Sequence, residues 1–209
     1  MLFVILFSIL SLTKANTVAK ETYCVIRNEA YKNEYLYLDE NIMKKVFTSP
    51  ANDEFIQDFS QMEWLLIPNP SSNDTFYMMN SASNELLCAS KHHLDLFKLR
   101  RKLDMIQLSE NDFNIFTGEN KNDDFNECIW KYQEIEKRNT DFKSKDDDDA
   151  FNGKGKRYVI WSVKYKEPLY AGSFLLKSSL VGKRNVYTWH KKPDTLQFIW
   201  HVYCNENEI

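Results

Sequence analysis

Short runs of apolar and aromatic residues alternate with polar connections along this chain, and the runs recur in the same order three times. In the first unit they are Tyr23–Asn28, Glu34–Tyr37, Val46–Thr48 and the segment that ends at Trp64. The runs of the other units are Phe76–Asn80, Glu85–Ser90, Ile115–Thr117 and the segment ending at Trp130, then Tyr158–Ser162, Glu167–Gly172, Val186–Thr188 and the segment ending at Trp200. Such runs between polar turns are typical of antiparallel strands with one buried face. The pattern predicts an all-β chain in which one unit occurs three times.

The three units differ in length. We place them at about residues 23–70, 76–132 and 158–204. The interval between the second and third runs is longest in the second unit, from Leu87 to Phe116, which predicts an insertion there. A further insertion, at about 134–156, follows Trp130. Its acidic run Asp146–Asp149, flanked by lysines and glycines, is typical of a solvated surface loop.

The order of these repeats resembles the β-trefoil superfamily over nearly the whole chain, from about Tyr23 to Cys204. Propellers generally use more blades, and solenoids need no closure, so they match less well. The resemblance implies a single domain in which six strands form a barrel and three hairpins cap it. The runs Glu34–Tyr37 and Val186–Trp189 also look like those of secreted trefoil-type proteins of insects, including biting flies. That resemblance implies a protein that acts by binding.

The first residues indicate export. Leu2–Leu12 is an apolar stretch of signal-peptide length, too short to span a bilayer, and Ala15 supplies the small residue for cleavage. We expect a signal peptide at residues 1–15 and a secreted, extracellular domain at residues 16–209, with no membrane span. Asn73 begins an Asn-Asp-Thr sequon, which predicts N-glycosylation in the connection between the first two units.

Four cysteines in an exported chain, without a CxxC pair, predict two disulfides rather than a metal site. From the sequence alone, three connectivities are open. The trefoil resemblance selects one, because the first and last strands of a trefoil are neighbours in its barrel. It implies a bond between Cys24 and Cys204, which leaves Cys88 to bond with Cys128.

Composition and motifs give little support for catalysis. The 209 residues are 43% hydrophobic and 14% aromatic, enough for one core, and a formal charge of −3 opposes nucleic-acid binding. No serine or cysteine stands in a recognisable nucleophile motif. His92 and His93 are adjacent and would point in different directions, and Asp146–Asp149 lacks the ligand pattern of a calcium loop. We expect no enzyme, no metal and no cofactor.

The repeated tryptophans belong to the predicted core rather than to a binding site. Ricin-type trefoil lectins carry a Gln-x-Trp motif in each unit, whereas this chain has Gln61 and Gln197 three positions before tryptophan, and Glu127 in the matching place of the second unit. The sugar sites of those lectins therefore cannot be carried over. Since the tryptophans recur at the period of the repeat, we expect them in the core.

Two surface segments are candidates for binding. Lys91–Lys102 is rich in basic residues interspersed with leucines, so that a helix there would have a basic and an apolar side. Trp189, followed by basic residues, lies outside the repeated pattern and would offer an exposed indole beside cations. The candidate ligand-binding residues are Lys98, Arg100, Arg101, Trp189, His190 and Lys191.

Together these features predict a secreted, monomeric, non-enzymatic binding protein that recognises an extracellular glycan or small ligand. The alternative is a protein-directed effector, such as a protease inhibitor or a host- or immune-modulating factor, that uses an insertion loop as its contact. Kunitz-type soybean inhibitors have the same fold, although no reactive-site motif of theirs is recognisable in this chain.

Overall fold

The computed structural model describes residues 22–31, 33–40, 45–50, 58–95, 100–108, 123–136, 156–175 and 183–204. Unit one contains β1 (Thr22–Asn28), β2 (Glu34–Asp39), β3 (Lys45–Pro50), the 3-10 helix η1 (Phe59–Met62) and β4 (Glu63–Pro68). Unit two contains β5 (Thr75–Asn80), β6 (Glu85–Asp95), β7 (Arg100–Gln107), η3 (Asp123–Cys128) and β8 (Ile129–Glu134). Unit three contains β9 (Lys156–Ser162), β10 (Glu167–Leu175), β11 (Arg184–Trp189), η5 (Leu196–Phe198) and β12 (Ile199–Cys204).

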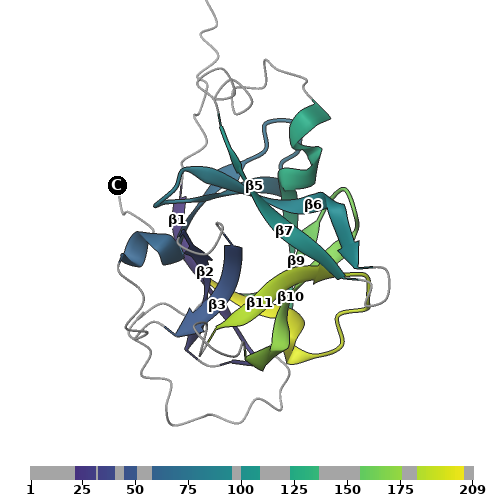
Figure 1. Ribbon diagram of the computed structural model, residues 1–209. Helices are drawn as coiled ribbons and strands as arrows, with labels where there is room; N and C mark the ends of the chain where they lie inside the picture. Colours follow the sequence, from purple (N-terminus) through teal and green to yellow (C-terminus); the bar gives the residue numbers. More distant parts are fainter. Residues whose placement is uncertain are drawn as a thin grey trace, which may run out of the picture.

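Two strands of each unit form a closed ring, and the other two form a hairpin. The antiparallel pairs β1–β4, β4–β5, β5–β8, β8–β9, β9–β12 and β12–β1 close a six-stranded barrel. The hairpins β2–β3, β6–β7 and β10–β11 meet at one end of it through the pairs β11–β3 and β11–β7. Figure 1 shows the three units following one another around the molecule. This topology is the β-trefoil, which confirms the predicted fold.

The three repeated tryptophans anchor the core in the same way. Trp64, Trp130 and Trp200 are all fully buried. Each indole N–H donates to a backbone carbonyl in the second strand of its own unit, at 3.1 Å from Trp64 to Leu36, 2.7 Å from Trp130 to Leu87 and 3.1 Å from Trp200 to Leu169. A buried indole N–H needs such a partner. The prediction that these residues are core members is confirmed.

Each hairpin begins with the same turn and a buried glutamate. Asn33, Asn84 and Lys166 have positive φ angles of 69°, 55° and 54°, and each immediately precedes the second strand of its unit. Asparagine tolerates this left-handed conformation better than most residues, so two of the three turns need no glycine. The next residues, Glu34, Glu85 and Glu167, are buried.

Buried ion pairs join neighbouring hairpins. Arg184 of β11 donates to Glu34 at 3.0 Å, and Arg101 of β7 donates to Glu167 at 3.0 and 3.2 Å. The same two carboxylates accept hydrogen bonds of 2.6 Å from Thr48 and Thr188, respectively. Because the pairs link units one and three and units two and three, they help hold the cap of the trefoil together.

Unit two departs from the predicted register. Its third strand is β7 (Arg100–Gln107), which pairs with β6 and β11, and not the segment Ile115–Thr117, which lies outside the described residues. The insertion in this unit therefore follows the third strand instead of preceding it. Likewise, the part of Lys91–Lys102 that the structure describes is strand rather than helix. Burial alternates from residue to residue there, as it does along a strand: buried Arg101 and half-buried Leu103 face inward, whereas Lys102 between them is exposed.

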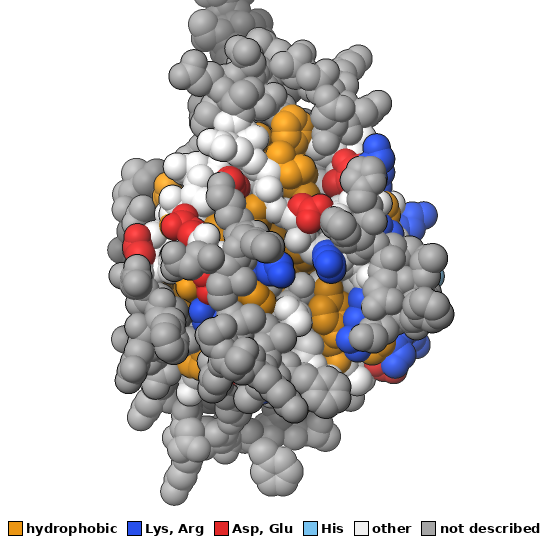
Figure 2. All heavy atoms as spheres, viewed as in Figure 1, with side chains coloured by type: hydrophobic (Ala, Val, Ile, Leu, Met, Phe, Trp, Pro, Cys, Tyr) orange, Lys and Arg blue, Asp and Glu red, His pale blue; other side chains and the backbone are white. Residues whose placement is uncertain are grey.

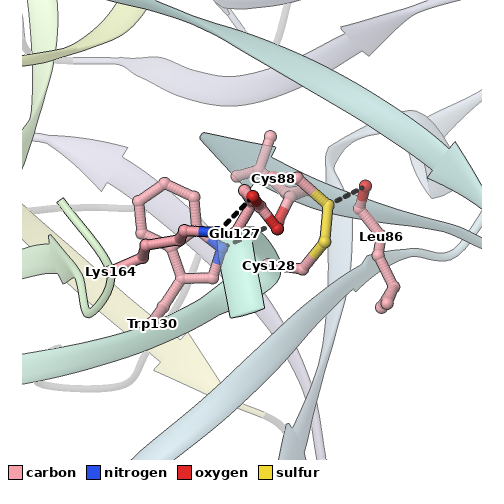
Figure 3. The surroundings of a disulfide bond; sticks show 7 residues. Leu86, Cys88, Glu127, Cys128, Trp130 and Lys164 are labelled. Atoms are coloured by element: carbon pink, nitrogen blue, oxygen red, sulfur yellow. Dashed lines mark hydrogen bonds and ion pairs between the residues drawn. A yellow bond between two sulfur atoms is a disulfide. The ribbon is translucent and has the colours of Figure 1, made fainter. Parts of the chain in front are cut away.

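Both predicted disulfides are present. Cys24 of β1 bonds to Cys204 of β12, its register partner, and Cys88 of β6 bonds to Cys128 at the end of η3. Figure 3 shows the second bond close to Trp130, with an ion pair between Glu127 and Lys164 beside it. The first bond joins the first and last strands of the barrel, and the second joins the hairpin strand β6 to the short helix that precedes β8.

Other predictions concern segments at the margins of this fold. The predicted signal peptide lies outside the described residues, as does the loop insertion apart from its ends. Asn73, the residue of the predicted glycosylation site, is exposed in the turn between β4 and β5. No helix in the described ranges has the length and apolar character needed to cross a membrane.

Candidate ligand-binding surface

The pairing of β7 with β11 brings the two candidate segments together. In this ladder Arg100 lies opposite Trp189 and Arg101 lies opposite Thr188. Side chains on a strand alternate between faces, so Arg100 and Trp189 share the outer face, whereas Arg101 points inward. The basic segment and the tryptophan, which are far apart in the sequence, thus form one surface. Figure 2 shows hydrophobic side chains with Lys and Arg beside them toward the lower right, where β10 and β11 lie.

An aromatic cluster supports this surface. Tyr170, Tyr187 and Phe198 are buried, and half-buried Trp189 packs against them. The Trp189 ring meets Tyr170 edge-on at 4.7 Å between centroids and lies nearly parallel to Phe198 at 6.0 Å. The indole is therefore fixed in orientation and less exposed than the sequence suggested.

Two cations lie on this cluster. The guanidinium carbon of Arg100 is 4.6 Å from the centroid of the Tyr187 ring and 4.5 Å from that of Trp189. The ammonium of exposed Lys191 is 4.8 Å from the centroid of Trp189. Aromatic faces attract cations through their quadrupole. Trp189 therefore positions Arg100 and Lys191 near each other.

Among the side chains that the structure describes, no carboxylate forms an ion pair with Arg100 or Lys191. Asp95 of β6 lies opposite Arg100 in the strand register, and its side chain is outside the described ones. The Nε atom of Arg100 and the hydroxyl of Tyr187 are buried without a hydrogen-bond partner among the described residues. Burial raises the pKa of the Tyr187 hydroxyl well above its ordinary value, although the charge of Arg100 acts in the opposite direction. Tyr187 therefore stays a neutral donor beside a cation.

The remaining candidate residues divide into three groups. His190 is exposed next to Lys191, at the edge of the surface. Arg101 is buried, with its donors directed to Glu167 and to the Ser90 carbonyl, so it is committed to the cap. Lys98 and the side chains of His92 and His93 lie outside the described residues.

Sequence reasoning missed the residues that support Trp189. Tyr170 belongs to β10 and Tyr187 to β11, two strands of the repeat, and Phe198 lies in the short helix before Trp200. Their positions in the repeat could have indicated this cluster, because Tyr170 and Tyr187 are partners on adjacent strands and therefore share a face of the hairpin.

The described residues contain no group of three or more His, Cys, Asp or Glu side chains able to hold a metal ion. His201 instead contacts Glu29, with 3.1 Å between its Nε2 and the carboxylate, and Glu29 also accepts from Arg157 at 2.7 and 2.8 Å. Burial disfavours the charged form of Glu29, but the hydrogen bonds from His201 and Arg157 outweigh it and hold the pKa of this carboxyl below its ordinary value.

Comparison with known proteins identifies the fold and no family. No protein-family model matches the chain, and no curated protein sequence does. Solved structures of β-trefoils are similar at low identity. An SDF2-like protein from Arabidopsis thaliana has 12% identity and a TM-score of 0.55 over 87% of this chain and 92% of its own. The lectin of Polyporus squamosus, bound to a human-type influenza-binding epitope, has 15% identity and a TM-score of 0.55 over 87% of this chain and 48% of its own. The cytolethal distending toxin of Haemophilus ducreyi has 10% identity and a TM-score of 0.54 over 87% and 82%.

Proposed function

We propose that this chain is a secreted, non-enzymatic binding protein, and that it recognises an anionic extracellular glycan through Arg100, Trp189 and Lys191. The observation that carries the proposal is the pair of cations held over one indole without a carboxylate partner among the described residues. The fold it shares with a glycan-bound lectin is compatible with this role, but a fold does not fix a function.

The chemistry of the surface selects a ligand that carries sulfate or carboxylate groups. A guanidinium offers a planar fork of donors that matches such anions, and an ammonium adds a point charge. The face of the half-buried Trp189 ring suits the uncharged part of a sugar ring. Because the chain as a whole has a formal charge of −3, the attraction is local to this surface.

The disulfides support the secreted part of the proposal, since such bonds persist in oxidising compartments. Cleavage of residues 1–15, glycosylation of Asn73, a monomeric state and an origin among secreted insect proteins stay predictions. Mass spectrometry of the protein expressed in a secretory host would test the first two.

The test is calorimetric titration of the disulfide-bonded chain with a heparin-derived oligosaccharide and with its desulfated counterpart. We expect binding of the sulfated form only, weakened by added salt because exposed charges are screened. Arg100→Ala should lower the affinity by roughly tenfold or more, as expected when a charge-assisted contact is lost. Lys131→Ala is the matched control, because it removes an exposed positive charge on β8, away from this surface.

Equal binding of both oligosaccharides, or equal losses in the Arg100→Ala and Lys131→Ala variants, would contradict the proposal. The alternative, a protein-directed effector, makes a different prediction. It requires stoichiometric inhibition of a serine or cysteine protease that Arg100→Ala leaves unchanged.

A further inference from the structure

Apart from the surface around Trp189, a hollow lies on unit two, near the border between units one and two. It has a volume of about 460 Å³ and is lined by Tyr23, Leu65, Met79, Ser83, Asn84, Gln107 and Leu108. These residues come from β1, β4, β5, the turn before β6, and the end of β7. None of them belongs to the surface around Trp189.

The lining has an apolar floor and a neutral polar rim. Leu65 and Met79 are buried register partners, and half-buried Leu108 packs against the cluster they belong to. Tyr23 is 43% exposed, which leaves part of its ring accessible at the rim. Asn84 and Gln107 are exposed, and no hydrogen bond of their side-chain amides is seen within the described part of the chain. None of the lining residues that the structure describes is charged.

The pseudo-threefold repeat shows how this part of unit two differs from its counterpart in unit one. The residue after the first strand is Glu29 in unit one, Ser81 in unit two and Val163 in unit three, and each backbone N–H donates to an equivalent carbonyl, at 2.9, 2.9 and 3.0 Å. In unit one the carboxylate of Glu29 reaches His201 and Arg157. Their counterparts in unit two, by the same register, are Leu65 and Tyr23. A short serine with apolar neighbours does not fill the space that the ion network of unit one fills.

We infer that this hollow binds an uncharged saccharide residue. Its volume falls within the range of small-molecule sites, which combine an apolar lining with a few polar groups. Two amides with both donors and acceptors suit hydroxyl or acetamido groups, and an accessible phenol ring suits the apolar face of a sugar. The described lining residues supply no charge that would attract an anion. The site differs in place and in ligand charge from the anion-binding surface around Trp189.

Methionine methyl groups give a direct readout. The protein would be labelled at the methionine methyl carbons and titrated with N-acetylglucosamine and its uncharged trimer, with the Met79 signal assigned through Met79→Leu. We expect the Met79 signal to move with saturation while that of Met78, which is fully buried in the core cluster, stays fixed. Tyr23→Ala should weaken binding roughly tenfold, the size expected for losing an aromatic contact.

Tyr132→Ala is the matched control, because Tyr132 is similarly exposed, at 51%, on β8. No movement of the Met79 signal at millimolar saccharide, or an affinity that Tyr23→Ala leaves unchanged, would overturn the inference. So would a Met79 signal that responds to benzyl alcohol and not to saccharide, because the hollow would then be an apolar site. Arg100→Ala should leave this titration unchanged. Failure of saccharide binding in the hollow can therefore be distinguished from failure of anion binding at the Trp189 surface.

Discussion

Units one and two have the same backbone at the point where the first strand ends, yet they fill the space beside it differently. In unit one, Glu29 binds Arg157 and His201. In unit two, Ser81 occupies the place of Glu29, and an apolar-walled hollow opens nearby. The equivalent backbone hydrogen bonds, from Glu29 in unit one and Ser81 in unit two, are both 2.9 Å long. The trefoil therefore constrains the main chain and the inward side chains, while the outer side of the barrel is free to carry different chemistry in each unit.

The largest loss of stability should come from replacing the core tryptophans, which all three units share. Replacing Trp130 or Trp200 by Ala removes a fully buried indole and its hydrogen bond, which should lower the free energy of unfolding by about 3–5 kcal/mol in either unit. Urea denaturation followed by circular dichroism measures this loss. A much smaller loss for Trp130→Ala than for Trp200→Ala would show that the core of unit two is not equivalent.

The ion network of unit one should give an intermediate effect. Glu29→Gln removes the negative charge that pairs with the buried guanidinium of Arg157, and should cost about 1.5–3 kcal/mol at neutral pH, the range for hydrogen bonds to charged groups. Because the pKa of Glu29 is lower in the folded chain than its ordinary value of 4.5, its contribution is present above that value and is lost as the pH falls through the folded pKa.

The measurement is the urea midpoint of wild type and Glu29→Gln at pH 7 and pH 3. The difference between them should shrink on acidification. A difference that does not change with pH would mean that the charge of Glu29 is irrelevant and that only its shape matters.

The buried core of this fold can be predicted from the sequence. Trp64, Trp130 and Trp200 recur with the repeat because each fills the equivalent space in its unit and donates to the equivalent carbonyl. The trefoil order then places Cys24 beside Cys204. Unit two shows the limit of this reasoning. Ile115–Thr117 matches the repeated pattern, yet the strand is β7, whose ladder with β11 is a long-range property that no local pattern displays.

The candidate surface was predictable only in pieces. Arg100 and Trp189 each stand out locally, as a basic residue in a basic segment and as a tryptophan outside the repeat. Their contact depends on the register of two strands from different units. The hollow on unit two could not be predicted from the sequence, because Ser81 and Asn84 are ordinary turn residues. Only the structural equivalence of Ser81 and Glu29 shows that a large charged side chain in unit one is replaced by a small one in unit two.

The smallest expected effect would sharpen the comparison most, because it transfers the chemistry of unit one into unit two. Ser81→Glu and Tyr23→Arg together recreate the pair formed by Glu29 and Arg157, since each new residue occupies the equivalent register position. Tyr23 is 43% exposed and Arg157 only 7%, so the new pair would be more solvated than the original. A double-mutant cycle from urea denaturation should therefore give a favourable coupling of only about 0.5–1 kcal/mol.

Ser81→Glu alone should destabilise the chain slightly, because its carboxylate would face Leu65 rather than a histidine. If the coupling is zero or unfavourable, the two places are alike in backbone but not in the direction of their side chains.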